Sequence, residues 1–251
     1  MLTVIILTLN EETALPQCLD SLSWIEDKLV FDSGSTDRTC DIAREYGARV
    51  VQRSFDNYAA QRNAALSETE SEWVLFIDAD ERVGSELVNE IHVAIQHQHQ
   101  VGWMIPRHNY IFGKLILNAG WYPDYQLRLF KRELGSYFVD RHVHELLDLK
   151  GPLGKMYNPI IHENYVDVSE FISKQRTYAK HEANMLHNQG VVPRVHNYWL
   201  QPIRQFLWRY ITLEGWRSGY HGVLLCVLMA YSQYMVYKQL SILRDSDIES
   251  S

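Results

Sequence analysis

The sequence predicts an α/β fold with a mainly parallel sheet, followed by a helical C-terminal extension. Short β-branched and aliphatic runs alternate with segments of helical period through the first hundred residues. Polar clusters follow several of these runs, and from residue 178 onward the pattern is helical. Because alternating strands and helices build βαβ units, the first strands should be parallel, with their carboxyl ends at one edge.

Composition and length place the chain among ordinary globular proteins. Of its 251 residues, 46% are hydrophobic and 22% are charged, which excludes disordered and collagen-like classes. One domain with an appendage is expected at this length. The three cysteines form no CxxC pair, so they exclude a cysteine-only zinc site and fit a reducing compartment. The first ten residues resemble a buried strand rather than a secretion signal, which favours a cytoplasmic protein.

Charge is unevenly distributed along the chain. The net charge is -7, which argues against general nucleic-acid binding. Residues 1–169 carry 15 Lys and Arg against 25 Asp and Glu, whereas residues 170–251 carry 9 against 6. The acidic part could hold a cation and the basic part could meet anionic lipid. Two solvated faces would give the same balance, so the charge pattern leaves both interpretations open.

The expected elements of the first hundred residues follow from local pattern. Strands are predicted at 3–9, 28–32, 48–52 and 73–77, where apolar runs have strand length. Helices are predicted at 13–23, from the 33–37 turn to Tyr46, at 58–68 and at 84–98. Ser35 or Thr36 could cap the second helix and Gly47 is suited to end it. Residues 100–162 are less regular and rich in aromatic, Gly and Pro residues.

The C-terminal part contains two unusual stretches. Residues 198–217 interleave arginines with aromatic side chains, and Gly222 to Tyr237 is a largely apolar run of sixteen residues. Crossing a bilayer takes roughly 20 residues, so a transmembrane helix is not expected. Both stretches have the composition of an element lying on a membrane surface. The alternative for the apolar run is a core helix packed on the sheet or on a dimer partner.

Acidic side chains follow three of the predicted strands. Glu11 follows the first, Asp32 ends the second and is expected to face the cleft, and Asp78 and Asp80 follow the fourth. Carboxylates that converge repel one another, so a cation should compensate them. Since alternate residues of an extended chain point to opposite sides, Asp78 and Asp80 could reach a metal and a ribose or water. An acid that caps the next helix is the alternative.

Phosphate-binding loops of the common kinds are absent. Neither GxGxxG nor GxxxxGK[ST] occurs, which argues against a nicotinamide-binding domain and a P-loop NTPase. Four other segments, TLNEE (8–12), FDSGSTDRT (31–39), QRNAAL (61–66) and WVLFIDADE (73–81), together resemble the family 2 glycosyltransferases. AGWYPDYQLRLFKR (119–132) and VHE (143–145) resemble the bacterial lipopolysaccharide-core branch that adds glucose.

The resemblance implies a fold and a set of site residues. It implies a GT-A type, single Rossmann-like domain over 1–165, with a nucleotide-sugar half (1–100) and an acceptor half (101–165), and a helical extension over 166–251. Donor contacts are implied at Thr8, Asn10, Glu11, Asp32, Arg62 and Asp78, with Asp32 at the uracil and Asp78 near the ribose. Arg62 could instead be a helix-surface arginine. Asp80 is implied to bind Mn²⁺ or Mg²⁺ with the diphosphate.

Two carboxylates are candidates for the general base. Asp124 in WYPDY is favoured because it matches an acidic position that precedes an arginine-bearing strand in relatives, here with Arg128. Glu145 is the alternative, and the pair His144-Glu145 could instead complete the metal or nucleotide shell.

The resemblance implies an inverting, metal-dependent glycosyltransferase. It would move a hexose, with glucose implied, from a UDP-sugar to a lipopolysaccharide or lipooligosaccharide core or another cell-envelope glycan. It would work in the cytoplasm, on the inner-membrane surface, without nucleic acid. One alternative is another metal-dependent nucleotide-sugar enzyme, such as a nucleotidyltransferase, although the Gly/Lys-rich loop usual there is absent. A non-catalytic glycan- or lipid-binding adaptor is the other, and the complete set of acids argues against it.

Overall fold

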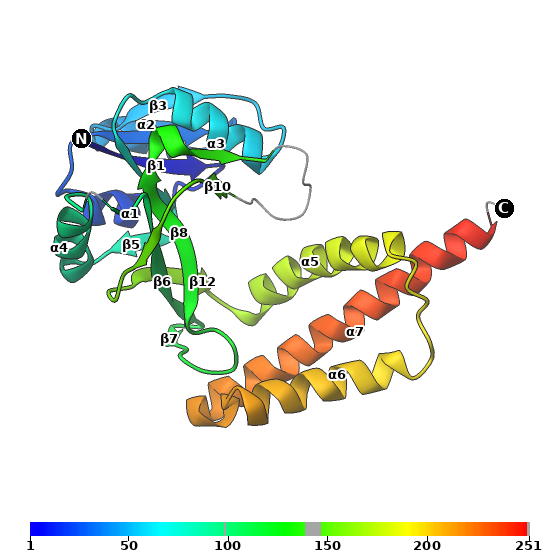
Figure 1. Cartoon of the computed structure of the whole chain (residues 1–251). Coiled ribbons are helices and arrows are strands. Elements are labelled where there is room, and N and C mark those ends of the chain that lie inside the picture. The colour runs from blue at the N-terminus through cyan, green and yellow to red at the C-terminus, as the bar shows by residue number, and fades with distance from the viewer. Residues whose placement is uncertain (98, 139–146, 250–251) are drawn as a thin grey trace. The chain divides into compact units, whose positions relative to one another are not determined.

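The computed structural model of the protein describes residues 1–97, 99–138 and 147–249, with side chains up to residue 245 (Figure 1). The strands are β1 (Leu2–Thr8), β2 (Lys28–Asp32), β3 (Arg49–Gln52), β4 (Trp73–Asp78), β5 (Glu81–Val83), β6 (Gly102–Ile111), β7 (Lys114–Leu115), β8 (Asp124–Lys131), β9 (Gly135–Tyr137), β10 (Leu147–Leu149), β11 (Leu153–Lys155) and β12 (Ile160–Tyr165). The helices are α1 (Leu15–Ser21), α2 (Thr39–Glu45), α3 (Tyr58–Ser67), α4 (Ser85–Ala94), α5 (Val168–Asn188), α6 (Asn197–Leu207) and α7 (Gly219–Glu249). Short helical turns are η1 (Arg132–Leu134), η2 (Trp208–Thr212, of π type) and η3 (Gly215–Ser218).

The main sheet has the order β3-β2-β1-β4-β8-β6-β12-β5, and β7 and β11 also pair with β6. The strands β3, β2, β1 and β4 are parallel neighbours, which confirms the predicted α/β fold. Later strands add antiparallel pairs, β8 with both β4 and β6, and β5 with β12. The register sets Thr8 beside Asp32 and Leu7 beside Asp78, so three carboxyl ends lie together.

Two apolar clusters cover the two faces of this sheet. On one face, side chains of α1, α2 and α4, such as Leu19, Ala43 and Ile91, pack on alternate strand residues. On the other face, α3 and the aromatic rings of Phe130 and Tyr137 pack on the remaining residues. Alternate strand residues point to opposite faces, which is why a central strand buried on both sides is apolar throughout.

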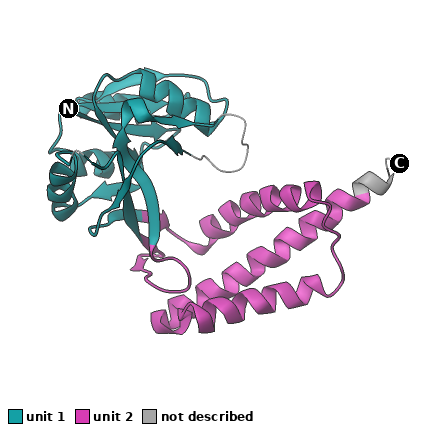
Figure 2. Cartoon of the chain, in the orientation of Figure 1, with its two compact units in different colours: residues 1–108, 124–162 teal, residues 109–123, 163–251 magenta. Residues whose placement is uncertain are grey.

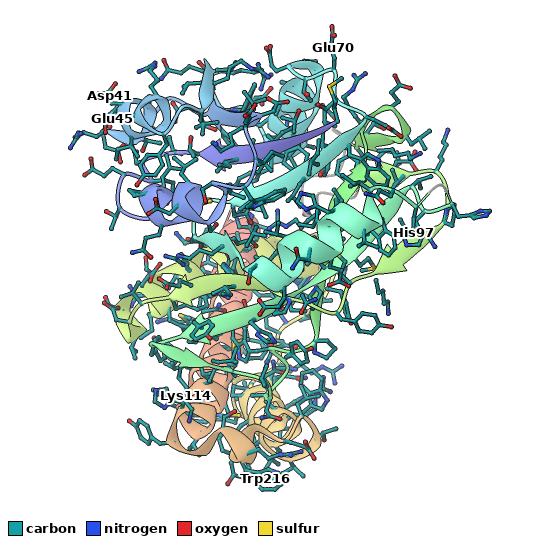
Figure 3. The ribbon with its side chains drawn as sticks, turned by 90° about the vertical axis from the view of Figure 1, so that its left-hand side faces the viewer. Asp41, Glu45, Glu70, His97, Lys114 and Trp216 are labelled. Atoms are coloured by element: carbon teal, nitrogen blue, oxygen red, sulfur yellow. The ribbon has the colours of Figure 1, made fainter. Side chains whose placement is uncertain are left out.

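The second helix ends as predicted but begins differently. Gly47 follows it with φ +71°, a left-handed conformation that glycine adopts without strain. Ser35 and Thr36 do not cap it, which corrects the sequence-based prediction: α2 begins after Arg38 without a side-chain cap. Their hydroxyl groups hydrogen-bond to Asp32 and Asn10 instead. Figure 3 shows that Asp41 and Glu45 of α2 point outward to solvent.

The described chain divides into two compact units, and the chain passes between them three times (Figure 2). The first unit comprises residues 1–108 and 124–162, and the second comprises 109–123 and 163–251. In the second unit, Leu225 and Leu228 of α7 pack with Phe171 of α5 and with Ile111 at the end of β6. One side of the apolar run 222–237 therefore packs in the core of the second unit, whereas Val223, Val227 and Tyr231 of the same run are 38–50% exposed. Within the described residues, no helix combines the length and hydropathy needed to span a bilayer.

Candidate functional site

The loops after β1 and β2 are tied together by hydrogen bonds between backbone and side chains. Asn10, at φ +56°, donates its N–H to Ser35 Oγ (2.8 Å) and accepts from the Thr36 N–H (2.9 Å). The Glu11 N–H donates to Thr39 Oγ1 (2.8 Å). Such reciprocal bonds satisfy the backbone of both loops, so each loop fixes the conformation of the other.

Asp32 is the buried centre of these loops. Its carboxylate accepts from Thr8 Oγ1 (3.0 Å), from the Gly34 and Ser35 N–H groups (3.0 and 2.8 Å) and from Gln52 Nε2 (3.1 Å). Burial by itself would raise the pKa of Asp32, but the donated hydrogen bonds outweigh it and hold the pKa below its usual range. Asp32 is 0% exposed. Its oxygens are occupied by the loop itself.

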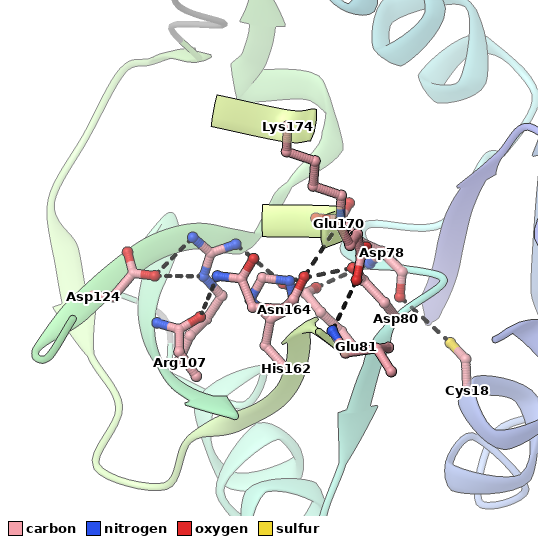
Figure 4. A network of polar contacts seen from close by, with 12 residues as sticks. Cys18, Asp78, Asp80, Glu81, Arg107, Asp124, His162, Asn164, Glu170 and Lys174 are labelled. Atoms are coloured by element: carbon pink, nitrogen blue, oxygen red, sulfur yellow. Dashed lines mark hydrogen bonds and ion pairs between the residues drawn. The ribbon is translucent and has the colours of Figure 1, made fainter. Parts of the chain in front are cut away.

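Asp78 and Asp80 have different partners, in keeping with the alternation predicted for the DAD segment (Figure 4). Asp78, the last residue of β4, forms a two-fold ion pair with Arg128 of β8, with 3.2 Å between Nη1 and Oδ1. Asp80 lies in the turn before β5, and its Oδ2 is 3.3 Å from Nε2 of His162 on β12. The DAD turn thus presents one carboxylate to an arginine and the other to an imidazole.

The buried side chain of Glu81 holds this turn in place. Its side chain is 0% exposed; Oε2 accepts from the Asp78 N–H (2.9 Å), and Oε1 lies 3.0 Å from Arg128 Nη2. Burial raises the pKa of Glu81, and the nearby Asp78 charge adds to the effect. Burial would likewise raise the pKa of Asp78, but Arg128 and Arg62 hold it well below its usual range. Asp78 therefore stays ionised beside the arginine.

Arg107 of β6 connects Glu81 with Asp124. Its Nη1 is 3.4 Å from Glu81 Oε1, and its Nε and Nη2 lie 2.8 and 2.7 Å from Asp124 Oδ2. Gln126 Nε2 donates to the other oxygen of Asp124 (2.7 Å). Arg107 and Gln126 therefore restrain both carboxylate oxygens of Asp124.

Arg62 of α3 lies in the same region. Its side chain is 11% exposed, with Nη2 3.8 Å from Asp78 Oδ1. The guanidinium also lies over the rings of Phe76 and Tyr137, 4.9 and 5.5 Å from their centroids. The interpretation of Arg62 as a helix-surface arginine is therefore wrong. It supplies positive charge to the carboxyl end of β4.

The Asp80–His162 pair is the arrangement most suited to a metal in the described residues. A carboxylate and an imidazole are both common ligands, and His162 is buried while Asp80 is partly exposed. No group of three or more His, Cys, Asp and Glu side chains gathers in the part of the chain that the structure describes. A cation there would take its remaining ligands from water or substrate phosphates, as Mg²⁺ commonly does. The candidates His144 and Glu145 lie outside the described residues.

Sequence reasoning missed four residues of this region, namely Glu81, Arg107, Arg128 as the partner of Asp78, and His162. Each belongs to a strand that pairs antiparallel, and each has a partner distant in sequence. The only signal was charge: an acid or a base within an otherwise apolar strand pattern is rarely left without a partner.

Replacing Arg128 tests the buried ion pairs. We expect Arg128→Met to lower the free energy of unfolding by about 3–5 kcal/mol, because buried Glu81 and partly exposed Asp78 would lose their shared arginine and keep only the more distant Arg107 and Arg62. Urea denaturation at neutral pH measures the loss. Arg132→Met, which removes an arginine paired with exposed Glu133, should cost less than about 1 kcal/mol. Equal losses in the two variants would contradict the role given to Arg128.

Replacing Asp32 tests the loop bonds and their pH dependence. Asp32→Asn should lose about 1–3 kcal/mol at neutral pH, since several donors would lose a charged acceptor. Because the folded-state pKa is lowered, the wild-type stabilisation exists above the unfolded pKa of about 3.9 and is lost as pH falls through the folded value. Urea denaturation along a pH series should show the two proteins converging in acid. A difference that stays constant below pH about 4 would argue against this assignment, and exposed Asp41→Asn serves as the control.

Comparison with known proteins agrees with this architecture. A lipopolysaccharide core biosynthesis glycosyltransferase, LpsC of Rhizobium meliloti, is 30% identical over 88% of this chain and 84% of its own length. Two solved structures share the fold. A mannosyltransferase of Pyrobaculum calidifontis, in complex with GDP-Man and Mn²⁺, has a TM-score of 0.55 at 14% identity over 97% of this chain and 86% of its own. TarS 1–349 of S. aureus in complex with UDP has a TM-score of 0.50 at 16% identity, over 95% and 91%.

The family model described as glycosyl transferase family 2 matches residues 3–138. This segment contains both loops, the DAD turn and the Arg107–Asp124 pair. The match and the relative from Rhizobium meliloti together show that this chain is a glycosyltransferase and belongs to glycosyl transferase family 2.

Proposed function

We propose that this glycosyltransferase is an inverting, metal-dependent enzyme. It would move a hexose from a UDP-sugar to a lipopolysaccharide or lipooligosaccharide core, or to another cell-envelope glycan. The main support for the proposal is that three carboxylates at the carboxyl edge of the sheet have different partners. Asp78 is held by arginines, Asp80 lies beside His162, and Asp124 is paired with Arg107.

A nucleotide-sugar donor is proposed for the loops after β1, β2 and β4. Ligands of open α/β sheets bind outside the carboxyl ends of the strands, where Thr8, Asn10, Glu11 and Asp32 lie. Because the oxygens of Asp32 are taken, a donor base would meet it only by replacing one of the hydrogen bonds in the loop. The UDP complex of the similar TarS structure supports a uridine nucleotide.

Asp80 and His162 are proposed to hold a divalent cation, Mn²⁺ or Mg²⁺. The Mn²⁺ and GDP-Man complex of the similar mannosyltransferase supports a metal-assisted donor site. A cation held by Asp80 and His162 would supply Lewis-acid screening of the diphosphate charge. Arg62, close to Asp78, would add a fixed positive charge at the same edge.

Asp124 is proposed as the general base. Its carboxylate lies at the start of β8 and is held by Arg107 and Gln126. A carboxylate that is already held in position loses less orientational entropy when it reaches the reactive geometry. It would take the proton of the acceptor hydroxyl on the side of the sugar opposite the diphosphate. Arg107 would orient the Asp124 carboxylate. Arg107 also contacts Glu81, and this contact connects Asp124 with the DAD turn. Glu145 stays the alternative base.

The acceptor is proposed from the relative and from the sequence resemblance. The name of LpsC states a part in lipopolysaccharide core biosynthesis, which supports a core oligosaccharide as acceptor and the cytoplasmic face of the inner membrane as the place of transfer. Glucose as the donor sugar rests on the sequence resemblance alone. The separation into a donor half (1–100) and an acceptor half (101–165) stays a prediction.

The donor is tested with purified protein and a panel of UDP-sugars with Mn²⁺ or Mg²⁺. A transferase should slowly release UDP from its own donor when water replaces the acceptor. Thermal shift with UDP gives an independent binding measure, because a ligand at 100 times its Kd adds roughly 2.7 kcal/mol of stability. Absence of both signals for every UDP-sugar would overturn the proposed donor. Binding without turnover on any acceptor would favour an adaptor.

The metal assignment predicts that variants without a metal ligand lose the added stability that Mn²⁺ gives to the UDP complex. Asp80→Asn and His162→Ala should each abolish the extra thermal stabilisation that Mn²⁺ gives to the UDP complex, because both would remove a ligand. Thermal shift with UDP, with and without Mn²⁺, measures this linkage. Exposed Glu86→Gln on α4 is the control. If either variant keeps the full Mn²⁺ effect, that residue is not a ligand.

The base assignment predicts a turnover defect without a binding defect. Asp124→Asn should keep UDP and metal affinity while kcat falls by roughly 10² to 10⁴, the range for loss of a general base. The assay needs an accepted glycan, because donor hydrolysis by water can bypass the base. Glu145→Gln decides between the candidates. If it loses turnover while Asp124→Asn stays active, Glu145 is the base.

A further inference from the structure

One side of α6 and η2 is an exposed apolar surface. It consists of Trp199, Leu200, Ile203, Leu207, Trp208 and Ile211, called here the α6 face. These residues are between 45% and 69% exposed. Their spacing of three and four residues sets them along one side of a helix. Folding normally buries such a stripe, and here it lies open.

The other side of α6 already makes the contacts that hold the second unit together. The Tyr198 ring lies 6.1 Å from Tyr234 of α7, and Phe206 stacks on Tyr210 with 5.4 Å between centroids. Arg209 donates to the Ala119 carbonyl oxygen (2.5 Å). Within the α6 face, the Arg209 guanidinium lies over the Trp208 ring, 5.6 Å from its centroid, and all six residues are still at least 45% exposed. A contiguous exposed apolar surface on a folded protein indicates an interaction site.

The sequence that contains the α6 face is mostly basic. Between residues 183 and 244 the sequence has one carboxylate, Glu214, and it is paired with Arg217 (2.8 Å). The same stretch has six cationic side chains, namely Arg194, Arg204, Arg209, Arg217, Lys238 and Arg244. Arg204 is exposed among the apolar residues of the face itself. Trp216 projects from the turn after η2 (Figure 3).

We propose that the α6 face binds an anionic lipid surface. Tryptophan and aliphatic side chains would enter the boundary between headgroups and acyl chains, and the exposed Arg204 would meet the phosphates. This inference deepens the proposed function, because a glycolipid acceptor lies in a membrane. The sequence indicated two stretches for such a role. The structure buries one side of α7, with Leu225 and Leu228 in the core of the second unit, while the six residues of the α6 face are all at least 45% exposed.

A second copy of the chain is the main competing occupant. In a two-fold contact the same surface meets itself, so the Arg204 side chains would approach each other without a carboxylate nearby. Like charges at short distance oppose such a contact. Anionic headgroups complement the same arginines. Charge thus favours lipid over self-association.

Flotation of the full chain with vesicles tests the proposal. Vesicles of equal parts phosphatidylcholine and phosphatidylglycerol should carry the protein at low salt and release much of it at high salt. The triple variant Leu200→Gln, Ile203→Gln, Leu207→Gln should bind at least about tenfold more weakly, because its buried apolar area is lost. Arg204→Gln should lose about fivefold on anionic vesicles and nothing on pure phosphatidylcholine.

A matched control uses exposed apolar residues of the first unit, Val93→Gln, Leu134→Gln, Leu153→Gln, and it should float like the wild type. Circular dichroism and the Tm show whether each variant is folded.

Wild-type protein that stays unbound at low salt, or a folded face variant that floats like the control, would overturn the proposal. So would a dimer in light scattering that only the face variant disrupts. Release of UDP from UDP-sugars without vesicles reports on the proposed function separately, since the α6 face has no part in that reaction.

Discussion

The burial of the Glu81 carboxylate next to Arg128 is the constraint on which the carboxyl edge of the sheet depends. A buried charge is tolerated only when its partners are held in good geometry. Glu81 belongs to β5 and its partners come from β4, β6 and β8, so these four strands have one relative arrangement that satisfies Glu81. The DAD turn inherits its shape from this arrangement. Asp80 can face His162 because Asp78 and Glu81 are already bound on the other side.

The two halves of the site are fixed by different forces. Neutral and singly charged hydrogen bonds join the loops after β1 and β2, with Asp32 at their centre. Paired charges fix the DAD turn and Asp124. In both halves, bonds within the protein restrain the side chains, and restrained groups lose less entropy when a ligand binds.

The parallel strands and their helices could be predicted from sequence because their pattern is local. Aliphatic runs and the three-to-four-residue spacing of leucines identify β1, α1 and β4 without knowledge of partners. The short strands β5, β9, β10 and β11 escaped prediction, since three residues carry no period. Asp78 and Asp80 could be found from the segment alone. His162 could not, because its pairing with Asp80 depends on the register of β12 with β5. The burial of Asp32 likewise depends on Ser35 and Gln52.

The three passages of the chain between its two units bear on how this protein could be recombined. Residues 109–123 belong to the second unit, where Ile111 and Ile116 are buried with Phe171 and Leu225. Cutting the chain after β12 would leave those isoleucines attached to the first unit without their apolar neighbours. The helical part is therefore not a module that one junction could exchange. Grafting it onto another catalytic domain requires the 109–123 hairpin to travel with it, so the two units must diversify together.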